Sequence, residues 1–105
     1  MAKPAAAAPH RAVQESARAA EDAATVTKDV GRRIAELRRE HDWTQENLAE
    51  RLRLPLKNLQ RIERGLQNLT IKSLVRFATA LGVRTAELFE APKSREVRRG
   101  RPPKE

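Results

Sequence analysis

The sequence predicts an all-α fold of five short helices, flanked by flexible N- and C-terminal tails. Apolar residues between positions 30 and 89 recur three or four places apart, which is the spacing of one face of a helix. Residues typical of helix ends separate these runs: Thr44, Thr70 and Thr85 precede them, and Gly65 and Gly82 follow them. With only 3% aromatic residues, the composition favours helices over a sheet.

The composition excludes several kinds of site. The chain has no cysteine, so it forms no disulfide, thiolate metal site or thiol nucleophile. Its two histidines, His10 and His41, lie far apart in the sequence, so neither a metal centre nor histidine-based catalysis is expected. No pairing of a nucleophile with a base is evident either. We therefore expect no enzyme activity, no catalytic residue, no metal and no cofactor.

Hydropathy and charge indicate where the chain works and what it binds. No apolar run approaches the roughly 20 residues that a membrane-spanning helix needs. The first residues, MAKPAAAAPHR, are too weakly apolar for a secretion signal. The 22 basic and 14 acidic residues give a net charge of +8, which favours a nucleic acid as the partner. We therefore expect a cytoplasmic, nucleoid-associated chain with no membrane partner.

Residues 1–27 form the first predicted segment, an alanine-rich arm. Its only large aliphatic residues are Val13 and Val26, which supply too little apolar bulk for firm docking, although alanine favours helix. The arm is therefore expected to be flexible or partly helical. From about Lys28 the spacing predicts a helix that ends near Asp42, with one narrow stripe made of Val30, Ile34, Leu37 and His41.

Residues 44–65, TQENLAERLRLPLKNLQRIERG, predict two short helices joined by a tight bend. The hydroxyl of Thr44 is placed to accept a hydrogen bond from an amide of the first turn. Arg53 and Leu54 make the bend. Pro55 opens the second helix, because its φ is already helical and its missing N–H is not needed there. Gly65 supplies a left-handed stop.

The second of these helices has two contrasting faces. At about 100° per residue, Leu59 and Ile62 define an inner side. The side chains opposite are Lys57, Gln60, Arg61 and Arg64, with Asn58 at the edge. Like charges four residues apart, here Lys57 and Arg61, repel on an isolated helix by about 0.2–0.5 kcal/mol. A polyanion relieves that repulsion, so the face indicates DNA binding; the alternative is a solvated basic face on a small helical domain.

Two more helices are predicted after a loop at residues 66–69. Thr70 is expected to cap a helix with Phe77 on its flank and an apolar face of Ile71, Leu74, Val75, Ala78 and Leu81. After Gly82, Thr85 is expected to cap a short last helix that bears Leu88 and Phe89. Too little chain follows to cover these two side chains, which predicts a dimer contact there. Pro92 disfavours further helix, so the folded domain is predicted to span residues 28–91.

Three stretches between Val30 and Glu90 carry a family resemblance: VGRRIAELRREHDWTQENLAERL, the LxxIERG pattern ending at Gly65, and SLVRFATALGVRTAELF. At these mutual distances they make the chain similar to the phage-repressor-like, Cro-type (XRE) helix-turn-helix family. The resemblance implies a compact five-helix, lambda-repressor-like DNA-binding domain. It further implies a regulator of transcription, typically a repressor or autoregulator, that binds operator sites in double-stranded DNA as a homodimer.

The resemblance assigns roles by position. Gln45 matches the family's glutamine that contacts bases or phosphates. Leu56, Lys57, Asn58 and Arg61 match the tip and outer face of the recognition helix, where a good base contact is worth about 1–3 kcal/mol. Arg64 and Asn68 are better placed for phosphate, which sets register rather than sequence. Together with the outer face, the candidate DNA-binding residues of the domain are Thr44, Gln45, Leu56, Lys57, Asn58, Gln60, Arg61, Arg64 and Asn68.

The family also pairs an arginine of its first helix with the glutamate of the IERG segment. Here these residues are Arg38 and Glu63, so a structural salt bridge is expected between them. Three features depart from the family's pattern. Arg53 replaces a common glycine in the turn, and Pro55 replaces a capping serine or threonine. Leu56, with Leu66 and Leu69, places apolar groups where polar ones are common, and it fits either a thymine methyl or a protein contact.

Residues 92–105 carry six basic and two acidic groups and have the composition of a disordered tail. Within the tail, Arg99-Gly100-Arg101-Pro102 resembles an AT-hook, a motif that binds the minor groove. Glycine lets an extended backbone enter the narrow groove, where Arg99 and Arg101 meet the negative potential of A·T tracts. Non-specific attraction to phosphate is the alternative, and both readings make DNA binding sensitive to salt.

The sequence leaves three functions open. The leading hypothesis is a sequence-specific DNA-binding regulator of transcription. A second is a protein-interaction module, such as the antitoxin of a toxin–antitoxin pair, indicated by the apolar groups at Leu56, Leu66 and Leu69 and by the alanine-rich arm. A third is a weakly specific architectural DNA binder driven by the basic tail. A stoichiometric protein partner distinguishes the second from the first, and abolished binding without the tail distinguishes the third.

Overall fold

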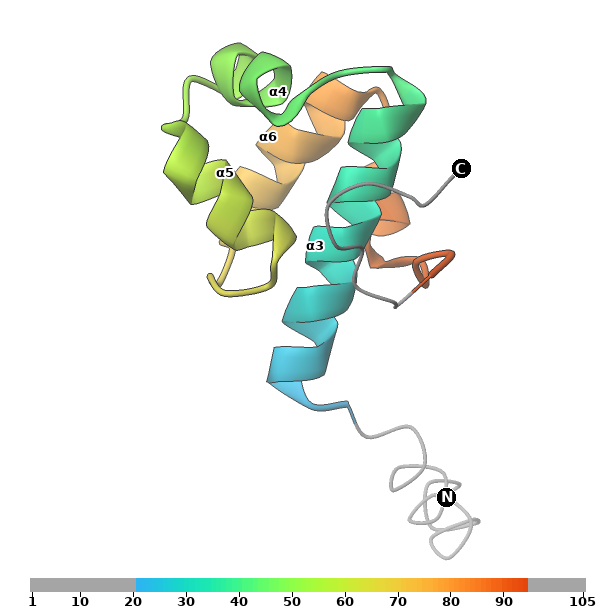
Figure 1. Ribbon diagram of the computed structural model, residues 1–105. Coiled ribbons are helices and arrows are strands. Elements are labelled where there is room, and N and C mark those ends of the chain that lie inside the picture. The colour runs from blue at the N-terminus through green and yellow to red at the C-terminus, as the bar shows by residue number, and fades with distance from the viewer. Residues whose placement is uncertain (1–20, 95–105) are drawn as a thin grey trace, which may run out of the picture.

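The computed structural model describes residues 21–94, which form four α-helices followed by one 3₁₀ turn (Figure 1). The elements are α3 (Ala23–Glu40), α4 (Gln45–Leu52), α5 (Leu56–Glu63), α6 (Ile71–Leu81) and η1 (Thr85–Phe89). No strand occurs among the described residues, and the predicted all-α class is confirmed. The long helix α3 contacts α5, α6 and η1, while α4 packs against α5 and α6.

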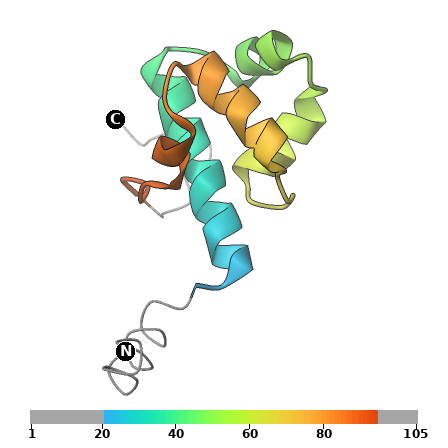
Figure 2. The ribbon, with the colours of Figure 1, turned by 180° about the vertical axis from the view of Figure 1, so that it is seen from behind.

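One apolar core lies where these elements meet. Each α-helix and the 3₁₀ turn contribute to it, and its fully buried side chains are Ile34, Leu48, Leu59, Leu81 and Leu88. Seen from behind, α6 lies across the molecule and η1 sits against the side of α3 (Figure 2). α4 and α5 therefore form one side of the domain, held in place by α3 and α6 (Figure 1).

The first helix is longer than expected. α3 begins at Ala23 rather than near Lys28, because the Asp22 carboxylate accepts a hydrogen bond from the Thr25 N–H at 3.3 Å. An N-cap of this kind together with helix-favouring alanines extends a helix without much apolar burial. At the other end His41 leaves the apolar stripe: its Nε2–H donates to the Leu81 carbonyl at 2.8 Å, and its ring stacks on Trp43.

Helix α6 is rotated about its axis relative to expectation. Thr70 caps it and Gly82 ends it with φ +74°, both as predicted. Phe77, predicted on the flank, is buried in the core, whereas Ile71 and Val75 are 71% and 46% exposed. The reason is that Phe77, Ala78 and Leu81 meet α3, α4 and η1, while no other described residues cover the edge that bears Ile71 and Val75.

The last element differs from its prediction in two respects. η1 is a 3₁₀ turn rather than a fifth α-helix, and Arg84 stands at its N-cap instead of Thr85, with the Glu87 carboxylate accepting from the Arg84 N–H at 3.1 Å. The expectation that Leu88 lacks cover is wrong, because η1 packs on both α3 and α6 and Leu88 is completely buried between them. Phe89 is 53% exposed.

Candidate nucleic-acid interface

Helix α4 is held by a reciprocal cap. The Thr44 hydroxyl accepts from the Asn47 N–H, and the Asn47 side-chain oxygen accepts from the Thr44 N–H, both at 3.0 Å. A capping box satisfies two amides that a helix start otherwise leaves free. Leu48, Ala49 and Leu52 bury the inner face. The exposed start of α4, with Thr44 and the half-buried Gln45, is thereby fixed relative to the core.

The turn between α4 and α5 uses an arginine in the left-handed region. Arg53 has φ +56° and ψ +45°, and the Leu54 N–H donates to the Ala49 carbonyl at 2.9 Å. The residue that replaces the family's glycine thus adopts the glycine-like conformation itself, at a cost of roughly 1–2 kcal/mol. Pro55 is the N-cap of α5, and, as predicted, it leaves that helix without a side-chain cap.

The two faces predicted for α5 are present. Leu59 and Ile62 are buried, and Lys57, Arg61 and Arg64 are exposed on the other side. Asn58 and Gln60 are half-buried at the two edges of this basic face. The guanidinium of Arg61 also donates to the Leu66 carbonyl at 3.3 Å, which ties the recognition-helix face to the loop that follows.

Arg38 and Glu63 form the predicted ion pair. The Arg38 Nε lies 2.7 Å from Glu63 Oε2, and Arg38 Nη2 donates to Glu63 Oε1 at 3.1 Å, so the contact is bidentate. Both side chains are about nine-tenths buried or more, with exposed fractions of 11% and 6%. Arg38 Nη1 also donates to the Trp43 carbonyl at 2.8 Å. The pair therefore joins α3 to the end of α5 and to the chain that leads into α4.

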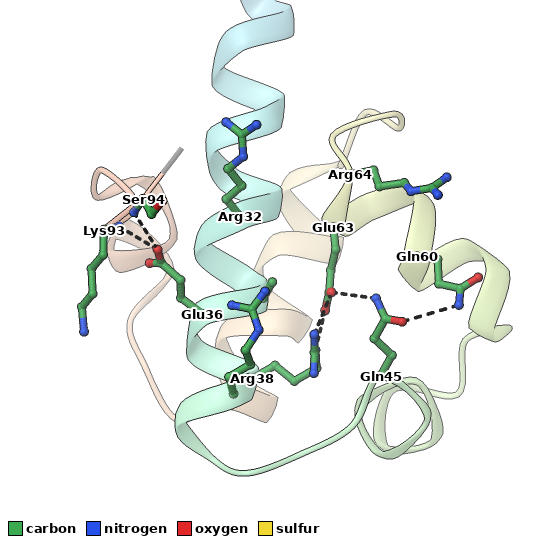
Figure 3. Close-up of a pocket in the computed structure, with 11 residues that line it drawn as sticks. Arg32, Glu36, Arg38, Gln45, Gln60, Glu63, Arg64, Lys93 and Ser94 are labelled. Atoms are coloured by element: carbon green, nitrogen blue, oxygen red, sulfur yellow. Dashed lines mark hydrogen bonds and ion pairs between the residues drawn. The ribbon is translucent and has the colours of Figure 1, made fainter. Parts of the chain in front are cut away.

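The ion pair continues into a row of polar side chains that sequence reasoning missed. Gln45 Nε2 donates to Glu63 Oε1 at 2.9 Å, and Gln60 Nε2 donates to Gln45 Oε1 at 3.5 Å (Figure 3). Gln45, predicted to contact DNA, is thus oriented by Glu63 at the start of α4. The side-chain amide of Gln45 is therefore engaged by Glu63 and Gln60. No pattern in the sequence predicts these contacts.

The remaining candidates divide by exposure. Asn68 is exposed in the loop between α5 and α6, beside Leu66, which is 52% exposed. Leu56 and Leu69 are half-buried and pack against the core, so part of each is unavailable to a partner. Arg99 and Arg101 lie outside the described residues.

Beside α5 the surface is hollowed into a groove whose walls come from α3, α5 and the start of α4 (Figure 3). Its arginines include Arg32 and Arg39 of α3, which are absent from the predicted site residues. A helical wheel of α3 does place them on one side, seven residues apart. Glu36 lies between them in the sequence, however, so the wheel also suggests that they are neutralised.

Two other features, a metal site and a membrane-spanning helix, are absent from the described part of the chain. Among residues 21–94, no three or more His, Cys, Asp or Glu side chains gather as a metal site would require. The described helices include none that is long and apolar enough to cross a membrane.

Comparison with known proteins places this geometry in a family. A helix-turn-helix family model matches residues 34–88, about half of the chain. An uncharacterized HTH-type transcriptional regulator of Sinorhizobium fredii, y4dJ, is 43% identical over 61 residues, which cover 58% of this chain and 79% of the relative.

Solved structures agree with that assignment. The restriction-modification controller protein C.AhdI of Aeromonas hydrophila aligns with a TM-score of 0.57 and 33% identity over 60% of this chain and 96% of its own. SinR, a master regulator for biofilm formation solved in complex with DNA, aligns with a TM-score of 0.55 and 32% identity over 58% and 98%. A hypothetical transcription factor from Neisseria, NHTF, reaches a TM-score of 0.62 at 25% identity over 70% and 84%. The chain belongs to the helix-turn-helix family of DNA-binding transcriptional regulators.

Proposed function

We propose that the protein reads a specific sequence in the major groove of double-stranded DNA with α5 and acts as a repressor or autoregulator. The exposed face of α5 carries the proposal. Lys57 and Arg61 project from it opposite the buried Leu59 and Ile62. Within residues 21–94 no ion pair neutralises either cation. A helix of this shape and charge fits a groove lined by polyanionic backbone.

The residues of this face divide between bases and phosphates. Lys57 and Arg61 are assigned to guanine and Asn58 to adenine, because those side chains match the donor and acceptor patterns of the base edges. Arg64 and Asn68, exposed farther along the chain, are assigned to phosphate. Thr44, Gln45 and Gln60 form the edge of the interface nearest to α3. Leu56 is half-buried, and its exposed part is assigned to contact with a thymine methyl group.

Dimerisation completes the proposal. A symmetric dimer doubles the contacts and reads a two-part site. Leu88 lies in the core of its own protomer, so of the two predicted contact residues only Phe89 is assigned to the dimer interface. In the tail, Arg99 and Arg101 are assigned to the minor groove beside the operator. The proposal includes no catalytic step and no cofactor, and it locates the protein at the nucleoid in the cytoplasm.

Exposed apolar side chains favour a second candidate, an interaction module such as an antitoxin. Leu66, Ile71 and Val75 are 52%, 71% and 46% exposed and lie in the loop before α6 and along α6. Contiguous exposed apolar side chains are typical of protein contacts, and Ile71 and Val75 are four residues apart on α6, about one helical turn. One stoichiometric partner that binds the wild type and is lost from a Val75→Lys variant supports this candidate.

Selection of duplexes from a random pool tests the proposed function. The full chain is compared with a chain that ends at Ser94, since Lys93 and Ser94 are hydrogen-bonded to Glu36 and belong to the folded part. Enrichment of one two-part sequence by both chains is the expected result. Enrichment of no sequence, or binding that disappears with residues 95–105, contradicts it and favours the architectural reading.

A further inference from the structure

The groove between α3 and α5 carries an excess of positive charge. Five basic and two acidic residues line it, and the lining also includes the Gln45 and Gln60 side chains (Figure 3). Arg32, Arg38 and Arg39 come from α3, Arg64 follows α5, and Lys93 comes from the segment after η1. These residues come from segments that are far apart in the sequence. Two of them already have ion-pair partners, Arg38 with Glu63 and Lys93 with Glu40.

Both acidic residues of the groove already have partners. Glu63 accepts from Arg38 and Gln45. The Glu36 carboxylate lies 3.4 Å from Arg33 Nη1, and it accepts from the backbone N–H groups of Lys93 and Ser94 at 2.7 and 3.3 Å. Neither carboxylate is therefore left to neutralise the other cations of the groove.

As a result, three arginines have no partner among residues 21–94. Glu36 follows Arg32 by four residues and precedes Arg39 by three, which are the spacings of intrahelical ion pairs. The carboxylate is instead engaged with Arg33 and with the backbone N–H groups of residues 93 and 94. Among the described residues, no hydrogen bond or ion pair involves the side chains of Arg32, Arg39 or Arg64. Such a concentration of unpaired cations attracts a polyanion.

The groove is continuous with the basic face of α5. Gln45, Gln60 and Arg64 belong both to its lining and to the proposed DNA interface. Arg32 and Arg39 are two helical turns apart on α3, so their Cα atoms are separated by about 10 Å along the helix axis. They extend the basic surface away from α5 rather than duplicating its base-reading position.

We propose that this groove is a second phosphate-binding surface, in which Arg32 and Arg39 hold the DNA backbone that flanks the bases read by α5. The inference rests on the proposed function and adds a contact made by α3. Arg64 belongs to both surfaces. The contact contributes to affinity and register, and it carries no sequence information, since phosphates are the same in every sequence.

The salt dependence of DNA binding tests the inference. A short duplex of random sequence is titrated with the full chain at several salt concentrations, using wild type, Arg32→Gln, Arg39→Gln and the double variant. Arg84→Gln serves as the matched control, because Arg84 is exposed in the loop between α6 and η1 and does not line the groove. Each lost phosphate contact reduces the magnitude of the negative slope of log K against log salt by about 0.9.

In the double variant the magnitude of the slope is expected to fall by about 1.8, and in Arg84→Gln the slope is expected to stay near the wild-type value. The preference among sequences is expected to be unchanged. Arg32→Lys plus Arg39→Lys keeps the charges and is expected to retain the wild-type slope, which separates a charge effect from a folding effect.

A double-variant slope equal to that of Arg84→Gln overturns the inference while leaving DNA binding by α5 intact. A double variant that keeps the wild-type salt slope for DNA but no longer binds polyglutamate also overturns the inference. In that case the groove binds acidic protein segments rather than DNA. A wild-type chain that binds no duplex at any salt concentration contradicts the proposed function instead.

Discussion

Gly31 of α3 lies directly against the backbone of Ile62 in α5. A Cβ atom built on Gly31 would stand 2.4 Å from the Ile62 carbonyl oxygen and 2.8 Å from that of Glu63. Contacts this short do not occur between a real Cβ and a backbone oxygen, so only glycine permits the observed approach of the two helices. The position of the recognition helix therefore depends on a missing side chain in the first helix.

Substituting Gly31→Ala is expected to destabilise the domain by about 1–2 kcal/mol. Forcing α3 and α5 apart costs about 1–3 kcal/mol, while the better helix propensity of alanine returns up to about 1 kcal/mol. The shift of α5 also weakens DNA binding. Urea denaturation and a duplex titration measure the two effects, and a variant at least as stable as the wild type shows that the helices do not pack this closely.

Replacing Arg38 by alanine is expected to cost on the order of 3–5 kcal/mol. The substitution leaves the carboxylate of Glu63 buried with only Gln45 as a donor, and an uncompensated buried charge is strongly destabilising. Replacing both partners, Arg38→Met with Glu63→Leu, recovers most of the loss because no charge is then buried. Urea unfolding of the three variants checks this, and an Arg38→Ala midpoint within error of wild type rules out the buried pair.

Glycine at the turn between α4 and α5 is expected to stabilise the protein. Arg53→Gly removes roughly 1–2 kcal/mol of left-handed strain and adds about 0.5–1 kcal/mol of unfolded-state entropy, for a net gain of about 0.5–1 kcal/mol. Asp42, at φ +60°, is the matched control. Because aspartate tolerates this region better, Asp42→Gly is expected to gain less, and thermal unfolding showing the reverse order contradicts the explanation.

Leu88 and Phe89 are neighbours with opposite expected roles. Leu88→Ala removes a fully buried side chain and is expected to cost about 2–5 kcal/mol of stability. Phe89→Ser is expected to leave unfolding nearly unchanged and to weaken the homodimer, because Phe89 is 53% exposed. Sedimentation measures the second effect. A wild-type chain that stays monomeric at high protein concentration removes Phe89 from the proposed interface.

Local signals in the sequence were sufficient for several helix ends and for the two faces of α5, but not for the starts of α3 and η1. Thr44, Thr70 and Gly82 act as predicted, since a cap depends on a few neighbouring residues. Leu59 and Ile62 are buried as the helical spacing indicates. The Arg38–Glu63 pair followed from the family resemblance rather than from spacing, because its partners are 25 residues apart.

The features that the sequence did not predict depend on tertiary contacts between distant parts of the chain. The cover of Leu88 and the rotation of α6 depend on how η1 packs, which no local pattern encodes. The same holds for the polar row from Glu63 through Gln45 to Gln60. The helical wheel of α3 predicts that Glu36 neutralises Arg32 or Arg39. In the structure the Glu36 carboxylate instead accepts hydrogen bonds from the backbone amides of residues 93 and 94. Helical spacing does not predict a competing partner that is distant in the sequence.

The central claim is that the outer face of α5 binds DNA, and a titration of the selected duplex with the Lys57→Ala plus Arg61→Ala variant tests it most directly. Both side chains are exposed, so the variant is expected to fold with an unchanged urea midpoint. Loss of two base contacts of about 1–3 kcal/mol each is expected to weaken specific binding at least roughly 30-fold and to reduce the salt slope. Unchanged affinity together with an unchanged slope contradicts the claim.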